Sequence, residues 1–189
     1  MTHAPRIMFI RHAEKPDKVA AGVTAAGTPD KEDLIVQGWQ RAGALGRFFA
    51  PVDPATRVKG ISQPGIIFAA MVNAKSSSLR PQHTVGPLAA LLGLTVNIGF
   101  GEGDEPGLAK AAIAAAQTMP VLIAWQHQDI PTIIKAINDK HHLGPHKWPG
   151  DRFDLVWVLD GDGKGGWTFS QVPQLLLPGD SPELVPVSG

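Results

Sequence analysis

An Arg-His pair, Arg11-His12, directly follows an apolar run at residues 7–10 near the amino terminus. In an open α/β sheet, ligands bind in the crevice beyond the carboxyl ends of the strands, so polar residues that follow a buried strand lie at the mouth of a site. Arginine offers a planar fork of donors that fits a phosphate or a carboxylate, and the histidine imidazole can attack, accept a proton or donate one. The pair therefore indicates phosphate chemistry, although an isolated Arg-His dipeptide is more often a surface pair.

Two further polar segments follow predicted strands. His127 comes two residues after the apolar run 121–125, and Arg80 lies in the polar stretch 73–84, between a short strand at 65–70 and the next helix. Because the carboxyl ends of parallel strands meet at one edge of a sheet, both arginines and both histidines are expected at one crevice. Each has a simpler alternative, since Arg80 could be a solvated loop residue and His127 a hydrogen-bonded residue at a strand end.

Apolar runs alternate with helical patterns along the chain, which predicts mostly parallel strands joined by right-handed crossovers. After the first strand, the predicted strands are 65–70, 95–100 and 121–125, the predicted helices are 33–50, 85–92, 105–119 and 130–138, and 153–159 with 167–172 form a hairpin or edge pair. Gln82, His83 and Thr84 are expected to cap the helix that begins near Val85. The expected architecture is therefore α/β.

Length and composition narrow the class of protein. We expect one domain over residues 1–189, with a proline-rich tail at 173–189 that packs as an extended strap or stays mobile. The formal net charge is zero and the basic residues are dispersed, which argues against nucleic-acid binding. The chain has no long apolar run, its first strand begins too early for a signal peptide, and it contains no cysteine. We expect a soluble, cytoplasmic protein without membrane partners; the oligomeric state stays open.

These motifs resemble those of the histidine phosphatase superfamily, the phosphoglycerate-mutase-like proteins. Arg11-His12-Ala13-Glu14 stands where the family carries Arg-His-Gly, with Ala13 in place of the commoner glycine. Arg80, in an Arg-Pro-Gln-His-Thr sequence, matches the second arginine, and His127 matches the second histidine. The order and spacing agree over roughly residues 6–172, and the chain is most similar to small bacterial members with Arg-His-Ala-Glu-Lys-Pro and Trp-x-His sequences.

The resemblance implies a three-layer sandwich and a hydrolase of phosphomonoesters. His12 would attack phosphorus through one ring nitrogen and form a phosphohistidine intermediate, while its other nitrogen donates to an acceptor, expected to be a backbone carbonyl. Arg11 and Arg80 would bind the nonbridging oxygens, and His127 would donate to the same oxygens. This scheme needs no metal and no cofactor, because the cationic side chains supply the positive charge. The expected partner is a small phosphorylated substrate or a phosphoprotein.

The general acid that protonates the leaving oxygen is less well defined. Many relatives carry an acidic residue just before a Phe-Gly or Tyr-Gly pair, whereas Phe100-Gly101 follows Gly99 here. Glu102 and Asp129 are the two candidates. Asp129 is equally well placed to cap the predicted helix at 130–138. The negative charge of Glu102 suits the positive end of the dipole of the predicted helix at 105–119. A phosphoramidate needs less help from an acid, so phosphohistidine on a protein is a further possible substrate.

Other patterns suggest different sites but are weaker. The segment 161–166 fits Gly-x-Gly-x-x-Gly, yet it opens no helix, and Lys164 occupies a ligand position of a calcium loop. His141, His142 and His146 lack a carboxylate partner at fixed spacing, so a zinc site is disfavoured.

Two alternative functions remain: a catalytically weak phosphate-binding module of the same fold and, less favoured in so short a chain, a phosphomutase. For the neighbouring residues the simpler roles are preferred. Glu14 and Lys15 could orient Arg11 or line the rim of the site, but exposed charges are the simpler account. Trp148 is expected to pack rather than to flank a substrate.

Overall fold

A five-stranded sheet forms the centre of the structure, a computed structural model that describes residues 4–139 and 141–187. The strand order is β2-β3-β1-β4-β5. The parallel part contains β1 (Arg6–Arg11), β2 (Ile66–Ala69) and β3 (Val121–Trp125). The strands β4 (Leu155–Gly161) and β5 (Trp167–Pro173) continue the sheet in antiparallel pairing, as the predicted hairpin requires. The sheet is therefore mixed, with a parallel core.

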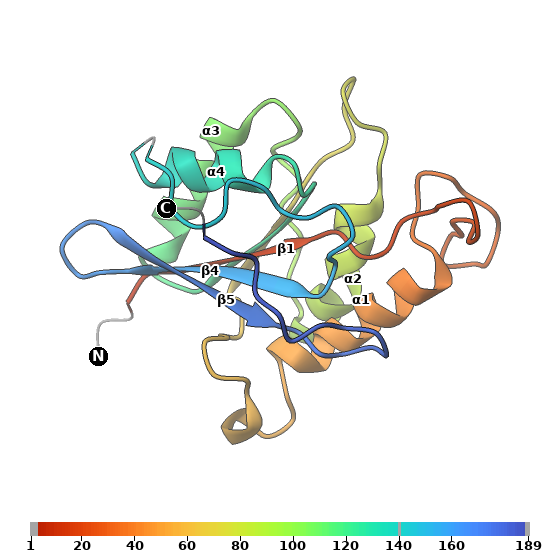
Figure 1. The fold of residues 1–189 in the computed structure, drawn as a ribbon, viewed down its shortest axis with the longest axis horizontal. Helices are drawn as coiled ribbons and strands as arrows, with labels where there is room; N and C mark the ends of the chain where they lie inside the picture. Colours follow the sequence, from red (N-terminus) through yellow and green to blue (C-terminus); the bar gives the residue numbers. More distant parts are fainter. Residues whose placement is uncertain (1–3, 140, 188–189) are drawn as a thin grey trace.

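Helices cover both faces of this sheet (Figure 1). The helices α1 (Val36–Phe49) and α2 (Arg80–Leu92) lie on one face, and α3 (Glu105–Ala116) and α4 (Ile130–Ile137) lie on the other. A short 3₁₀ turn, η1 (Pro54–Thr56), follows α1. The predicted three-layer α/β sandwich is thus the observed architecture.

The first strand shows why its sequence reads as a continuous apolar run. Ile7 and Phe9 pack into the hydrophobic cluster on the side of α3 and α4, whereas Met8 and Ile10 pack into the cluster on the side of α1 and α2. All four side chains are fully buried. A strand that is covered on both faces has no solvent-facing side, so its sequence is continuously apolar instead of alternating between apolar and polar residues.

Four predicted elements differ from the structure; one of them, helix α3, ends at Ala116 rather than at residue 119. Residues 95–100, all within the described part of the chain, form a single isolated bridge, between Asn97 and Phe68, rather than a strand. Asn97 Oδ1 accepts a turn hydrogen bond from Gly99 N. Helix α2 begins at Arg80 rather than at residue 85. Pro81 fits its first turn, because the backbone N–H that proline lacks has no acceptor within the helix at that position. Helix α1 begins at Val36 rather than at residue 33.

The proline-rich tail packs across the sheet edge and α1 as an extended strap. We call residues 174–187 the C-terminal strap; residues 188 and 189 of the predicted tail lie outside the described residues. Gln174 N donates to Asp154 O, and Ser181 N donates to the Asp154 carboxylate. Across the described ranges, no helix is both long and apolar enough to cross a membrane.

Candidate active site

The ends of β1 and β3 bring the first motif and His127 to one edge of the sheet. Arg11 is in register with Trp125, and the backbone N–H of His12 donates to Trp125 O at 3.0 Å. His127 therefore follows β3 at the same edge of the sheet as His12, as parallel pairing predicts.

His12 is held as a neutral imidazole with one nitrogen free to attack. Its Nδ1 lies 2.7 Å from the backbone oxygen of Ala13, and since a carbonyl only accepts, Nδ1 carries the proton. The side chain is only 5% exposed. Burial lowers the His12 pKa to about 3; the hydrogen bond with Ala13 O acts in the opposite direction, and the positive charges of Arg11 and Arg80 add to the decrease. The lone pair of Nε2 is therefore available at any ordinary pH.

Arg11 is fixed along one edge of its guanidinium group and open along the other. Its Nη1 donates to Gly150 O at 2.6 Å and makes longer contacts of 3.4 to 3.5 Å with Arg152 O and Pro149 O. The ring of Phe153 stacks 3.8 Å from the guanidinium carbon. Nε and Nη2 are buried and find no hydrogen-bond partner among the described residues. This Nε–Nη2 edge has the geometry that binds two oxygens of a phosphate.

Burial also affects the acidity of Arg11. Desolvation lowers its pKa to about 10, although the carboxylates of Glu14 and Asp151 act in the opposite direction and Arg80 adds to the decrease. The group remains charged at neutral pH. Buried guanidinium nitrogens of Arg11 and Arg80 find no acceptor among the described residues, which favours a bound anion at this place.

Arg80 is the first residue of α2, so it enters the site from a helix start rather than from a loop. Its Nη1 donates to Lys31 O at 3.2 Å, while its buried Nε has no partner within residues 4–139 and 141–187. Burial lowers its pKa. Thr84 connects this helix to the first motif, since its hydroxyl donates to Arg80 O and accepts from Ala13 N at 2.8 Å.

The expectation that Gln82, His83 and Thr84 cap a helix was wrong, because all three lie inside α2. Gln82 donates to Ala70 O, and His83 Nδ1 is 2.6 Å from the carboxylate of Asp33. Thr84 is a positioning residue that the sequence analysis missed. A threonine four residues after Arg80 is the only local signal, since its hydroxyl can bond the carbonyl one helical turn earlier.

His127 is half-buried two residues beyond β3. Burial, followed by the charges of Arg11 and Lys15, lowers its pKa to about 4. Its Nδ1 is buried, and the described residues offer it no hydrogen-bond partner. A neutral imidazole still has one N–H to donate, so His127 can contact a phosphate oxygen.

The two candidate acids form a second cluster beside this one. Glu102 accepts from Gln126 Nε2 at 3.2 Å, and Gln126 is the residue before His127. Burial, followed by the negative charges of Glu105 and Glu102, raises the pKa of Asp129 to about 6. Asp129 stands at the N-cap position of α4, but in the described structure its side chain makes no capping bond and its Oδ2 has no partner. The capping explanation for Asp129 was therefore wrong.

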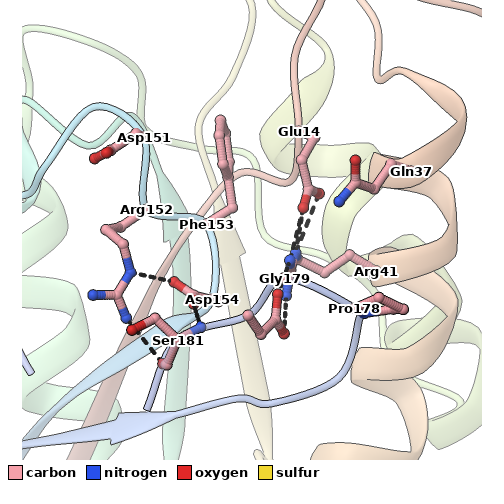
Figure 2. A pocket seen from close by; sticks show the side chains of 11 residues that line it. Glu14, Gln37, Arg41, Asp151, Arg152, Phe153, Asp154, Pro178, Gly179 and Ser181 are labelled. Atoms are coloured by element: carbon pink, nitrogen blue, oxygen red, sulfur yellow. Dashed lines mark hydrogen bonds and ion pairs between the residues drawn. The ribbon is translucent and has the colours of Figure 1, made fainter. Parts of the chain in front are cut away.

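Glu14 is not an exposed charge, contrary to expectation. It is only 7% exposed, and its carboxylate pairs with Arg41 of α1 at 2.7 Å. The same guanidinium group contacts Asp180 of the C-terminal strap at 2.7 Å. Figure 2 shows the Glu14 carboxylate directed at Arg41. Burial disfavours the charged form of Arg41, but the bonds to Asp180 and Glu14 more than offset this and raise its pKa. Lys15 is exposed as predicted.

Trp148 packs, as preferred from the sequence. Its ring lies 4.5 Å from that of Trp157, and its Nε1 donates to Arg152 O. Within the described ranges, no three His, Cys, Asp or Glu side chains are arranged to hold a metal ion. The rings of His142 and His146 lie close together, with centroids 4.1 Å apart and planes tilted by 47°.

Comparison with known proteins identifies the fold. No protein-family description and no curated protein sequence matches the chain. Among solved structures, a candidate phosphohistidine phosphatase, SixA from Agrobacterium tumefaciens, is similar with a TM-score of 0.50 and 17% identity over 89% of this chain and 97% of that chain. This similarity shows that the two chains share a fold, the layered α/β arrangement that the sequence predicts.

Two mycobacterial structures are also similar. One is an open reading frame product from Mycobacterium tuberculosis, with a TM-score of 0.49 and 14% identity over 90% of this chain and 97% of that chain. The other is a mycobacterial glucosyl-3-phosphoglycerate phosphatase, with a TM-score of 0.48 and 13% identity over 90% of this chain and 98% of that chain.

Proposed function

We propose that this protein is a metal-independent phosphomonoester hydrolase that works through a phosphohistidine intermediate on His12. One observation carries the proposal: a buried, neutral imidazole with a free Nε2 lies among unpartnered guanidinium nitrogens of Arg11 and Arg80. Buried donors without partners are costly, and they are found where a ligand supplies the missing acceptors. A nucleophile surrounded by such donors suits transfer of a phosphoryl group.

The first chemical step would be attack of His12 Nε2 on phosphorus. A P–N bond forms while the bond from phosphorus to the ester oxygen breaks, and the leaving oxygen takes a proton from an acid. Arg11 and Arg80 would hold the nonbridging oxygens through their free nitrogens, with His127 as a further donor. Because the protonated Nδ1 of His12 donates a hydrogen bond to Ala13 O, the ring is held in the orientation that attack requires.

In the second step, water attacks the phosphohistidine. The P–N bond breaks, inorganic phosphate leaves, and the lone pair returns to Nε2. The conjugate base formed in the first step accepts the proton of the water, so the enzyme returns to its starting state. The guanidinium groups supply the positive charge for both steps, and the scheme has no role for a metal ion or an organic cofactor.

Asp129 is the better of the two candidate acids. Its raised pKa of about 6 keeps part of the carboxyl protonated in mildly acidic solution, whereas Glu102 is engaged by Gln126. Glu102 then helps indirectly, since its negative charge is one cause of that raised pKa. Small phosphorylated compounds or phosphoproteins of the cytoplasm are the proposed substrates, and phosphohistidine would need the acid least.

The test is turnover of an aryl phosphate by the purified protein, with chelator present throughout and His12→Asn as the control. Asparagine keeps a donor for Ala13 O, so the control is expected to fold. We expect turnover that disappears in His12→Asn, and ³²P from labelled substrate retained on His12 after rapid quenching. Phosphate binding without turnover or labelling would instead establish a phosphate-binding module.

A further inference from the structure

The segment 31–33 runs along the start of α2 and holds one end of the Arg80 guanidinium group. The carbonyl of Glu32 accepts from Leu79 N at 3.3 Å, at the residue just before the helix. The carbonyl of Lys31 accepts from Arg80 Nη1 at 3.2 Å, whereas Arg80 Nε is buried and has no partner among the described residues. The position of this segment therefore governs how Arg80 presents its free nitrogen.

A buried pair fixes the segment on the helix. Asp33 is fully buried, and its Oδ1 lies 2.6 Å from His83 Nδ1. Because a carboxylate only accepts, Nδ1 carries the proton of this hydrogen bond. The same oxygen accepts from Leu34 N at 2.7 Å, so the carboxylate is held from two sides. His83 is three residues after Arg80 in α2, and residues at this spacing lie on the same face of a helix.

Helix α1 packs against this pair. The ring of Trp39 in α1 lies 5.2 Å from the imidazole of His83, with the two planes tilted by 32°. Trp39 Nε1 also donates to Val23 O at 2.8 Å, which connects an earlier part of the same loop to α1. The imidazole is thus confined between the Trp39 ring and the Asp33 carboxylate.

Stability alone does not account for the pair. The other carboxylate oxygen of Asp33, Oδ2, is buried and has no hydrogen-bond partner in the described structure. A carboxylate that is taken out of water loses hydration that a single partner does not replace, so a buried pair is weak evidence for stability. A satisfied polar contact in the interior does specify one arrangement of the elements that it joins. Here it joins segment 31–33 to the helix that begins with Arg80.

We propose that Asp33 and His83 are positioning residues for the phosphate site: they fix segment 31–33 on α2, keep Lys31 O on Arg80 Nη1 and so leave Arg80 Nε for a phosphoryl oxygen. The inference rests on the proposed function, because it assumes that Arg80 binds the phosphoryl group. Neither Asp33 nor His83 touches the substrate. Loss of the pair should therefore weaken phosphate binding only through Arg80.

A double-mutant cycle with Arg80 tests this role. Binding of inorganic phosphate, followed by ³¹P NMR titration, is the measurement, because it needs no turnover and reads weak affinities. Asp33→Ala combined with His83→Leu removes both partners, so no buried charge is left unpaired and the variant is expected to fold. This change should weaken phosphate binding about tenfold when Arg80 is present, as residues of one hydrogen-bonded network are coupled. In the Arg80→Ala background it should have no further effect.

Two further variants separate positioning from a general loss of structure. His83→Asn keeps an N–H donor near the place of Nδ1, so it should recover most of the phosphate affinity. Arg6→Leu breaks a partly exposed ion pair at the start of β1, whereas the phosphate site lies beyond the end of that strand. It should leave phosphate binding unchanged.

The outcomes for the pair and for the phosphatase are distinct. Equal losses of affinity with and without Arg80 would show that the pair acts on the fold as a whole, and would overturn the inference even if the wild type hydrolyses aryl phosphates. If the wild type binds phosphate without turnover and the cycle is coupled, the positioning role stands and the phosphatase fails. No binding of phosphate by the wild type overturns the inference, because Arg80 then has no anion to bind.

Discussion

Arg41 and Glu14 form a buried ion pair with Nη2 2.7 Å from Oε1, and the two side chains are only 3% and 10% exposed. Because Arg41 also contacts Asp180, one side chain of α1 connects the segment that follows His12 to the C-terminal strap. The strap thereby supports the site from outside the sheet. This connection holds a tail without regular secondary structure against α1.

Removal of Arg41 should therefore be strongly destabilising. Arg41→Ala leaves two largely buried carboxylates without their partner, which should cost about 3 to 5 kcal/mol of unfolding free energy. Arg6→Ala is the matched comparison, since its ion pair with Asp160 is 24% and 32% exposed and should contribute no more than about 1 kcal/mol. Urea unfolding of both variants checks this. Equal losses would mean that the buried pair does not anchor the strap.

Gly38 should not tolerate a side chain. A Cβ atom there would lie 2.6 Å from the backbone oxygen of Glu14, so α1 or the segment after His12 would have to move. Gly38→Ala is expected to lose about 1 to 3 kcal/mol. Gly43→Ala, in the same helix with nothing within 4 Å, should instead gain about 0.5 to 1 kcal/mol. Thermal unfolding of both variants tests the close approach, and a gain in Gly38→Ala would disprove it.

Loss of either arginine should impair catalysis more than folding. Arg80→Ala and Arg11→Lys are each expected to lower kcat/KM for an aryl phosphate by about 10²- to 10³-fold, since each removes donors aimed at the phosphoryl oxygens. Lysine is chosen at position 11 because Arg11 is buried against Phe153. Arg47→Ala, an exposed change on α1, should have no effect. An unchanged rate in either arginine variant would remove that residue from the site.

Asp129 should matter only for substrates with poor leaving groups. Asp129→Asn is expected to slow hydrolysis of an alkyl phosphate by about 10²-fold or more, and that of an aryl phosphate little, because phenolate leaves without protonation. In the wild type, the alkyl rate should fall as pH rises above about 6, where the carboxyl loses its proton. This decrease should be absent in Asp129→Asn. If Glu102→Gln alone produces these effects, Glu102 is the acid.

His12 should make the folded protein less stable in acid. Its folded pKa of about 3 lies below the ordinary 6.5, so between these values the unfolded chain binds a proton that the folded chain does not. Stability should therefore rise with pH across this window, by up to about 1.4 kcal/mol per pH unit from this residue. Urea unfolding from pH 4 to pH 6 should show a smaller slope in His12→Asn. Identical slopes would show that His12 is not held neutral by the fold.

Much of the site could be predicted because its main residues follow strands. Arg11, His12 and His127 come directly after apolar runs, and parallel pairing places the ends of those runs side by side. Arg80 was found by its position in a sequence motif, although it opens a helix instead of lying in a loop. The segment 95–100 was mispredicted although β2 is available beside it, because only Asn97 pairs with β2 and the chain then turns, with Gly99 N donating to Asn97 Oδ1.

The sequence by itself determined the layered α/β fold and the sheet edge where the candidate catalytic residues lie. Continuous apolar runs indicate strands buried on both faces, and their alternation with helical patterns indicates parallel strands. Only the tertiary structure decided which acceptor holds the His12 proton, which carbonyls fix Arg11, and that Arg41 binds both Glu14 and Asp180. Arg11 meets Gly150, and Arg41 meets Asp180, across 139 positions of the chain. Such contacts depend on how distant segments pack, and no local periodicity records that packing.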